Sequence, residues 1–241
     1  MARRFALLTV VLVSLAAAPS CRFGAGQGVT DQGQKISSLY VLLFWIAIPV
    51  AVIVYGLMLW SIVRYRRRND DLPKQTRSNL PIEVAYTVIP IFMVIGIFIA
   101  TFRTERTVDR VVSNPTVVVN ATAFQWQWRF QFPASNLSVV GLPNRPPIIE
   151  LPVGETIRVN VASADVVHSL FVPAFLFKRD AIPGVVNHFD WTIPASAAGQ
   201  TFRGECAAFC GLNHAQMTFF IKAVTPEEFQ SWLTQQPGAT P

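Results

Sequence analysis

The sequence predicts an α+β membrane protein in which a two-helix transmembrane hairpin is followed by a β-sandwich or barrel. Hydrophobic residues make up 51% of the chain and the mean hydropathy is +0.39, which is too apolar for an ordinary soluble domain. Two long apolar runs lie within the first 103 residues. Short segments that alternate apolar and polar side chains follow them, and such alternation is typical of half-buried strands.

The N-terminus has the layout of a signal peptide, which we expect over residues 1–20. Arg3 and Arg4 precede an uncharged apolar run, and small residues close it. Residues 21–38 are expected to be an outer linker, since they begin with a polar stretch rich in Gly and Gln. Cys21 directly follows Ala-Pro-Ser, which is compatible with a bacterial lipoprotein site acylated on the cysteine. A free Cys21 behind an ordinary signal peptide or an uncleaved anchor is the alternative.

Residues 39–103 are predicted to form the transmembrane hairpin, with helices at about 39–63 and 84–102. No charged residue occurs between Lys35 and Arg64. About 20 consecutive apolar residues cross a bilayer as a helix, so each run is long enough for one span.

The loop between the two helices, residues 64–82, sets the orientation of the chain. It holds six of the 20 basic residues, namely Arg64, Arg66, Arg67, Arg68, Lys74 and Arg77. By the positive-inside rule this loop faces the cytoplasm, which places the C-terminal domain on the outer face of a bacterial plasma membrane. From Thr104 onward ten acids oppose nine bases, so the net charge of +6 reflects topology and predicts no nucleic-acid partner.

Residues 104–235 are expected to form one β-domain that ends in a short helix, followed by a tail at 236–241. Besides the segment described next, strands are predicted at 148–151, 156–161, 168–172, 188–193, 201–205 and 217–224. The segment 116–132 alternates apolar with polar residues and is predicted to place four aromatic side chains on one strand face, those of Phe124, Trp126, Trp128 and Phe130. Thr225-Pro-Glu-Glu predicts a capping box with Pro at the first helical position, which starts a helix that runs to about Gln235.

The last cysteine-bearing stretch, 204–218, reads G-E-C-A-A-F-C-G-L-N-H-A-Q-M-T and contains most of the candidate metal ligands. Four soft donors lie within twelve residues: Cys206, Cys210, His214 and Met217. His168, at the start of an upstream β-like run, adds a second imidazole. Thiolate, imidazole and a weak thioether are the donors of copper electron-transfer sites.

Two simpler interpretations of the cysteine pair compete with copper. A zinc site is one, but zinc sites favour more Cys or His ligands and do not use Met. A disulfide between Cys206 and Cys210 is plausible outside the cell, yet it leaves His214 and Met217 unexplained.

The pattern C-x₃-C-x₃-H-x₂-M with an upstream His resembles the dinuclear copper (CuA) motif of cytochrome c oxidase subunit 2, and the resemblance runs from about Ser37 to Leu233. It implies a cupredoxin-like Greek-key β-barrel and two copper ions bridged by two thiolates. The implied ligands of the two ions are His168, Cys206, the backbone carbonyl of Ala208, Cys210, His214 and Met217. In the family pattern His168 and Met217 complete one copper, while His214 and the Ala208 carbonyl complete the other.

Ala208 departs from the family, which usually has Glu at this position. A carbonyl ligand survives the change. The Glu carboxylate reaches a magnesium or manganese ion at the subunit 1 boundary in the family, and Ala208 cannot, so we do not expect that ligand here.

The resemblance implies that the chain is the electron-accepting subunit of a proton-translocating haem–copper oxidase. Electrons would come from cytochrome c or a cytochrome bc-type supercomplex and pass to the haem of subunit 1, where oxygen is reduced. Subunit 1, subunit 3 and membrane lipid are the implied partners, and no oxygen chemistry is expected on this chain alone. The alternatives are a copper-free quinol-oxidase subunit, a nitrous oxide reductase copper domain and a membrane-tethered copper carrier. The intact ligand set opposes the first, and the hairpin opposes the other two.

Three further residues take roles from the resemblance. Trp126, in Q-W-Q-W, matches the residue through which electrons enter, with strand packing as its alternative, while Trp128 is expected to pack. Glu83, in P-I-E-V-A-Y, matches a carboxylate near the mouth of a proton-uptake route, with a helix-start Glu as its alternative. Asp165 is expected to contribute to a docking site for the donor.

Overall fold

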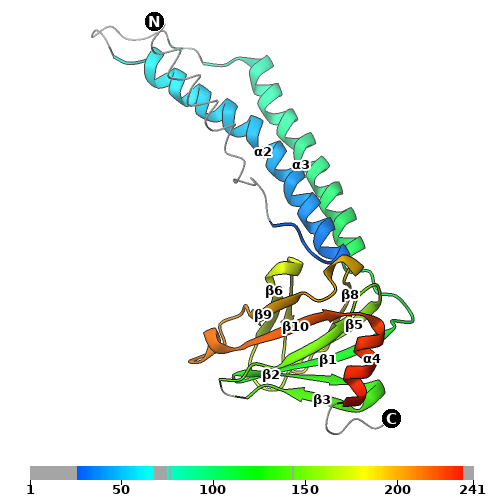
Figure 1. The fold of residues 1–241 in the computed structure, drawn as a ribbon. Helices are drawn as coiled ribbons and strands as arrows, with labels where there is room; N and C mark the ends of the chain where they lie inside the picture. The colour runs from blue at the N-terminus through cyan, green and yellow to red at the C-terminus, as the bar shows by residue number, and fades with distance from the viewer. Residues whose placement is uncertain (1–25, 68–74, 76, 143, 236–241) are drawn as a thin grey trace, which may run out of the picture.

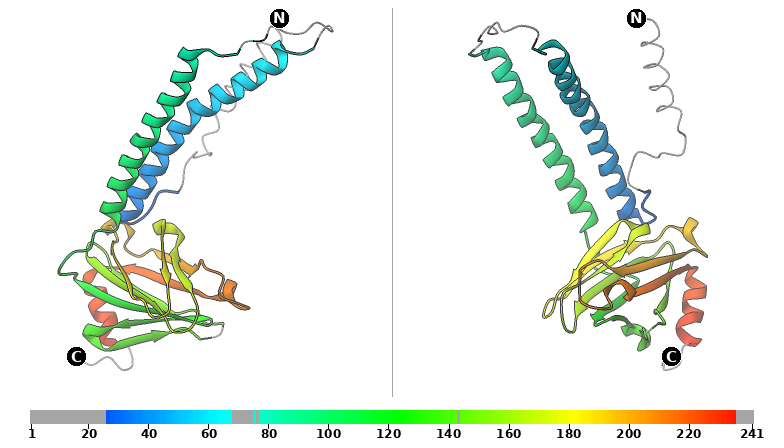
Figure 2. Two further views of the ribbon diagram at one scale, coloured as in Figure 1. Left: turned by 180° about the vertical axis from the view of Figure 1, so that it is seen from behind. Right: turned by 90° about the vertical axis from the view of Figure 1, so that its left-hand side faces the viewer.

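The computed structural model describes residues 26–67, 75, 77–142 and 144–235. Two long helices stand side by side on one end of a β-domain, and a short C-terminal helix packs on the side of that domain (Figures 1 and 2). The predicted signal peptide, the candidate lipidation site Cys21, the tail 236–241 and part of the basic loop lie outside the described residues.

The first long helix, α2, spans Asp31–Arg64 and so begins eight residues before the predicted start at 39. The side chain of Thr30 caps it, with the Gly33 N–H donating to Thr30 Oγ1 at 3.0 Å. Thr30 is fully buried, and the neighbouring Val29 N–H donates to the Ala174 carbonyl at 2.9 Å. The helix therefore takes in residues 31–38 of the predicted outer linker, and contacts of its first turn with the β-domain support this early start.

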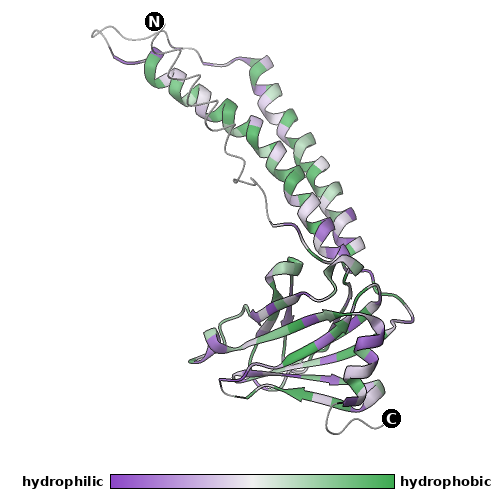
Figure 3. Ribbon diagram, viewed as in Figure 1, coloured by the Kyte–Doolittle hydropathy of each residue, from purple (hydrophilic) through white to green (hydrophobic). Residues whose placement is uncertain are grey.

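The second long helix, α3, spans Leu80–Val108 and extends six residues beyond the predicted end at 102. The charged turn after the apolar run continues the helix, and the Asp109 N–H closes it by donating to the Glu105 carbonyl at 2.8 Å. The apolar windows of α2 and α3 have mean hydropathies of 2.5 and 2.3, and none of their residues is buried in the protein. Figure 3 shows the apolar residues along both helices. A hairpin with this exposed surface is suited to lipid and to partner helices.

Ten strands within the described residues form two five-stranded sheets, in the orders β3-β2-β1-β5-β8 and β4-β10-β9-β6-β7. Their bounds are β1 Val117–Phe124, β2 Gln127–Phe132, β3 Leu137–Val140, β4 Ile148–Pro152, β5 Thr156–Ser163, β6 His168–Val172, β7 Phe177–Ala181, β8 Asn187–Thr192, β9 Thr201–Cys206 and β10 Thr218–Val224. Strand β1 pairs with β5 and β10 pairs with β4 in parallel, while the other pairs are antiparallel. These non-sequential neighbours confirm the predicted cupredoxin-like sandwich with Greek-key crossovers.

The core lies between the two sheets and is built from the inward half of each alternating strand. Val119, Ala121 and Ala123 of β1 are buried, and the residues between them are half-buried. Trp128 and Phe130 of β2 meet Phe219 of β10 across the sandwich, with ring centroids 5.5 and 5.1 Å apart. Full burial of each such ring stabilises the fold by roughly 1.5–3 kcal/mol.

The segment 116–132 is not one strand, as the alternation predicted, but two strands joined by a tight turn. Ala123 pairs with Trp128 and Phe124 with Gln127, which leaves Gln125 and Trp126 in the turn. Trp126 therefore does not share the buried face of Trp128. No Gly, Pro or Asn marks this turn; long-range hydrogen bonds to its backbone and side chains hold it, so a local pattern could not reveal it.

Two strands escaped the sequence analysis, β3 and β7, and each is an edge strand. Edge strands are short and carry polar side chains, so their periodicity is weak. The C-terminal helix α4, Pro226–Gln235, is as predicted. The Thr225 N–H donates to Glu228 Oε2 at 2.9 Å and the Glu228 N–H donates to Thr225 Oγ1 at 3.2 Å, which confirms the capping box.

Candidate metal centre

Two neighbouring strands of one sheet and the ligand loop, residues 207–217, position the candidate ligands. His168 begins β6 and Cys206 ends β9, and these strands pair with Leu170 opposite Cys206. The ligand loop starts and ends beside Cys206, because the Cys206 N–H donates to the Met217 carbonyl at 3.0 Å. Two residues 38 positions apart in sequence, His168 and Cys206, thus meet at one end of the sandwich.

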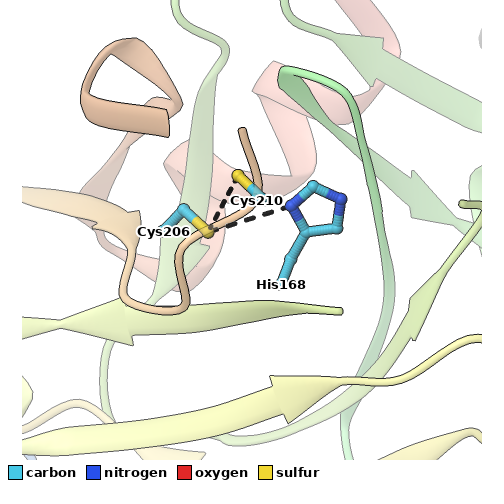
Figure 4. Close-up of side chains that lie close together, drawn as sticks. All are labelled: His168, Cys206 and Cys210. Carbon is cyan, nitrogen blue, oxygen red and sulfur yellow. Dashed lines mark hydrogen bonds between the residues drawn. The ribbon is translucent and has the colours of Figure 1, made fainter. Parts of the chain in front are cut away.

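The two thiols lie at the centre of the cluster. Their Sγ atoms are 3.8 Å apart, and Cys206 Sγ lies 3.8 Å from Nδ1 of His168. Figure 4 shows these three side chains pointing toward one another. On the other side, Cys210 Sγ lies 3.5 Å from Nδ1 of His214. The donor atoms of His168, Cys206 and Cys210 are all within 4.8 Å of one another, and all three residues are buried.

Two weaker donors complete the set, one beside each thiol. The Ala208 carbonyl lies 3.2 Å from Cys206 Sγ, and Met217 Sδ lies 3.9 Å from Cys210 Sγ. Met217 is fully buried, which keeps its thioether against the cluster. The structure therefore brings together all six groups that the sequence singled out as ligands.

The arrangement fits a metal better than either simpler interpretation of the cysteine pair. A sulfur separation of 3.8 Å is far from the roughly 2.05 Å of a disulfide bond. Sulfur and imidazole nitrogen donors, with a thioether among them, suit copper and not a hard cation such as magnesium. Burial, reinforced by the neighbouring Cys206, raises the pKa of the Cys210 thiol to about 12, so binding of a metal there releases a proton.

Asp165 orients His168, a role that the sequence analysis missed. Its Oδ1 lies 2.8 Å from His168 Nε2, so the ring donates there and leaves Nδ1 free toward Cys206. Asp165 also accepts the Gln125 and Val166 N–H groups, each at 2.6 Å. Burial opposes ionisation of Asp165, but these hydrogen bonds outweigh it and hold the pKa of the carboxyl below its ordinary value. The D-x-x-H spacing of Asp165 and His168 was the sequence signal from which this contact could have been predicted.

Trp126 lies directly against the ligand loop. Its Nε1 donates to the Cys210 carbonyl at 3.1 Å, and Gln125 Nε2 donates to the same oxygen at 2.8 Å. The next residue, Gly211, has a φ of 120°, and a Cβ there would lie 3.2 Å from the Trp126 ring. Glycine at 211 therefore allows the indole to approach, and Trp126 is half-buried.

Glu83 and Trp128 lie apart from the donors. Glu83 is in the first turn of α3, where its Oε1 accepts the Asn79 N–H at 2.9 Å, at the end of the helix far from the β-domain (Figure 1). Trp128 is fully buried and its ring centroid lies 6.5 Å from that of His168, so it packs behind the ligand.

Two family models match this chain. The transmembrane domain of cytochrome c oxidase subunit II matches residues 18–104, and the periplasmic domain of the same subunit matches residues 142–224. A probable cytochrome c oxidase subunit 2 of Streptomyces avermitilis is 36% identical, covering 94% of this chain and 84% of its own length. Cytochrome c oxidase subunit 2 of Mycobacterium bovis is 28% identical over 88% of this chain and 74% of its own. The crystal structure of the periplasmic domain of subunit II of cytochrome oxidase from Bradyrhizobium japonicum is 31% identical, with a TM-score of 0.46, over 52% of this chain and 95% of its own.

A membrane hairpin that carries a cupredoxin-like domain with a buried sulfur and imidazole cluster defines a membrane-anchored copper electron-transfer protein. The chain belongs to the cytochrome c oxidase subunit 2 family. It is the electron-accepting subunit of a haem–copper oxidase, works together with the other oxidase subunits, and takes the dinuclear copper centre as its cofactor. The hairpin lies in the membrane and the β-domain on its outer face.

Proposed function

We propose that this chain receives electrons from a cytochrome c at the surface around Trp126 and delivers them to the haem of subunit 1 in a bacterial plasma membrane. The observation that carries the proposal is the hydrogen bond from Trp126 Nε1 to the Cys210 carbonyl, at 3.1 Å. It joins a partly exposed indole to the backbone of a candidate bridging ligand through a single contact. Subunit 3 is a proposed further partner within the same membrane complex.

The proposed ligands are His168, Cys206, the Ala208 carbonyl, Cys210, His214 and Met217. When bound, a thiolate-bridged copper pair supplies a one-electron acceptor that needs little change of geometry. The chain contributes a rigid frame for it: His168 is held by Asp165, and the loop is closed at its base by the bond between Cys206 and Met217. Because the thiols and Met217 are buried, water is kept from the cluster.

The division of the weak donors follows the family pattern in our proposal, with Met217 beside His168 and the Ala208 carbonyl beside His214. The shortest thiol contacts run differently, since Ala208 lies against Cys206 and Met217 against Cys210. Cys206 and Cys210 would both hold the copper pair, so each weak donor lies next to a shared sulfur in either division.

Two proposed roles concern residues away from the copper site. Glu83 is proposed to gather protons at the cytoplasmic edge of the membrane while it also caps α3 through the Asn79 N–H. Cys21 is proposed to be acylated after removal of residues 1–20. An acyl chain would add a second anchor to the hairpin, and intact-mass measurement of the chain from membranes tests it.

Anaerobic stopped-flow spectroscopy on the purified oxidase complex tests the main proposal. Reduced cytochrome c is mixed with oxidised oxidase, and the visible thiolate-to-copper absorption is followed together with the haem absorption. We expect the copper absorption to bleach first and the haem to be reduced afterwards. Reduction of the haem with no earlier change in the copper absorption would contradict the proposal.

A further inference from the structure

A groove of about 590 Å³ lies beside Trp126. Its charged lining residues are arginines, whereas a basic electron donor would need carboxylates there. The groove runs between the turn after β1, the connection from β3 to β4 and the ligand loop. Its lining includes Trp126, two arginines, Arg129 and Arg145, and amide side chains from Gln125 and Asn213. No carboxylate is among the described residues that line it.

Both arginines keep their charge available to a partner. Each is exposed, and neither forms an ion pair within the part of the chain that the structure describes. Arg129 lies over the ring of Phe124, with its guanidinium carbon 5.8 Å from the ring centroid. Backbone hydrogen bonds with Leu142 hold Arg145 at the groove.

The acids nearest the groove in sequence or contact are already engaged. Asp165 reaches the turn through the Gln125 N–H, but its carboxylate also accepts from His168 and Val166. Glu205, next to Cys206, lies 3.5 Å from the guanidinium of Arg203. Neither carboxylate lines the groove, whose described lining carries the two positive charges of Arg129 and Arg145 and no negative one.

An apolar residue stands at the rim of the same surface. Leu212 is 89% exposed and lies between Gly211, which touches the Trp126 ring, and Asn213, which lines the groove. An exposed apolar side chain beside a half-buried aromatic ring, with charges at the margin, is typical of a protein interface.

We propose that the electron donor presents an acidic face to Arg129 and Arg145 while an apolar contact covers Leu212 and Trp126. This inference rests on the proposed function and specifies its donor: a soluble cytochrome c whose haem edge is bordered by carboxylates. Opposite charges across an interface raise the association rate. Salt screens this attraction, and at physiological ionic strength the screening length is about 8 Å.

The test uses the purified oxidase complex with two reduced soluble cytochromes c, one acidic and one basic, over a range of salt concentrations. Wild-type oxidase is expected to oxidise the acidic cytochrome faster at low salt, with a rate that falls as salt rises. The double variant Arg129→Glu/Arg145→Glu is expected to shift the ratio of the two rates about tenfold toward the basic cytochrome. Lys222→Glu reverses one exposed base on β10, outside the groove, and serves as the control that leaves the ratio unchanged.

Each rate is divided by oxygen consumption driven by the small mediator N,N,N′,N′-tetramethyl-p-phenylenediamine, which reports the loaded oxidase without a protein donor. A faster reaction of wild type with the basic cytochrome, or an unchanged ratio in the double variant, overturns the inference and leaves the proposed function in place. Failure of both cytochromes while the mediator drives turnover overturns the cytochrome donor itself, together with this inference.

Discussion

Trp126 and Cys210 are joined by a hydrogen bond of 3.1 Å from the indole Nε1 to the backbone carbonyl. The bond connects a turn between two strands of one sheet with a loop that follows a strand of the other sheet, 84 residues later in the chain. It therefore fixes the position of a partly exposed aromatic ring relative to a buried thiol. The path proposed for electrons depends on this contact.

Replacement of Trp126 by Phe removes the donor of that bond and keeps an aromatic ring. We expect the rate of electron transfer from reduced cytochrome c to fall about tenfold or more, which corresponds to about 1.4 kcal/mol of barrier, with copper content unchanged. Stopped-flow kinetics and metal analysis measure the two quantities. Trp232→Phe, on α4, is the control, and an equal effect in both variants would refute a specific role for Trp126.

Replacement of Asp165 by Asn tests the orientation of His168. Loss of the carboxylate weakens the bond that holds the ring with Nδ1 toward Cys206, so we expect copper affinity to fall by roughly 10–100-fold. Titration with a copper chelator measures the affinity. Asp180→Asn is a matched control, because Asp180 accepts from Ser169 Oγ at 2.7 Å and contacts none of the six donors. Unchanged affinity in Asp165→Asn would show that Asp165 serves docking alone.

The linker between α3 and β1 is held by a buried ion pair of Arg158 with Asp190. Asp190 is 2% exposed and accepts the Val112 N–H at 2.7 Å, while Arg158 donates to the Val112 carbonyl at 2.6 Å. Asp190→Ala leaves a partly buried guanidinium without its partner, so we expect a loss of roughly 3–5 kcal/mol in the free energy of unfolding.

Denaturant unfolding of the full chain in detergent, followed by Trp fluorescence, measures this loss. Lys222→Gln breaks the more exposed ion pair with Glu150 and is expected to cost less than about 1 kcal/mol. Similar costs for the two variants would show that the Arg158 pair does not hold the linker.

Two substitutions of Glu83 can distinguish its proposed roles in proton gathering and in capping of α3. Glu83→Gln keeps an oxygen that can accept the Asn79 N–H and removes the charge, whereas Glu83→Ala removes both. If Glu83 gathers protons, both variants lower proton uptake by the oxidase in vesicles, and the Gln variant assembles normally. Normal proton uptake with Gln would leave Glu83 as a helix cap.

The parts of the fold that short-range patterns specify were predictable from the sequence. The strands β4, β5, β6, β8, β9 and β10, the capping box at Thr225 and the two membrane helices each follow from periodicity or from a local motif. The turn at Gln125 and Trp126 was missed because Asp165 and the Cys210 carbonyl stabilise it, and both lie far away in the chain. The early start of α2 at Asp31 likewise depends on burial of Thr30 against the β-domain.

In the candidate site, too, local sequence patterns predicted some features, while others depend on long-range contacts. Soft donors at short spacing in residues 206–217 indicate copper through their chemistry, and the upstream His168 fits the same donor set. The support of His168 by Asp165 and the unpaired arginines beside Trp126 arise from tertiary packing, which no local pattern contains. Sequence analysis therefore identified the donors and missed most of what surrounds them.

Copper stoichiometry with electron paramagnetic resonance on the full chain, purified in detergent and loaded with copper, tests the central claim most directly. The account predicts two copper ions per chain and a mixed-valence signal in which one unpaired electron couples to two copper nuclei. Cys206→Ser is expected to abolish that signal, while Met217→Leu, which keeps the buried volume, retains both ions with an altered spectrum. One copper ion per chain with a mononuclear signal, or zinc in preference to copper, would contradict the account.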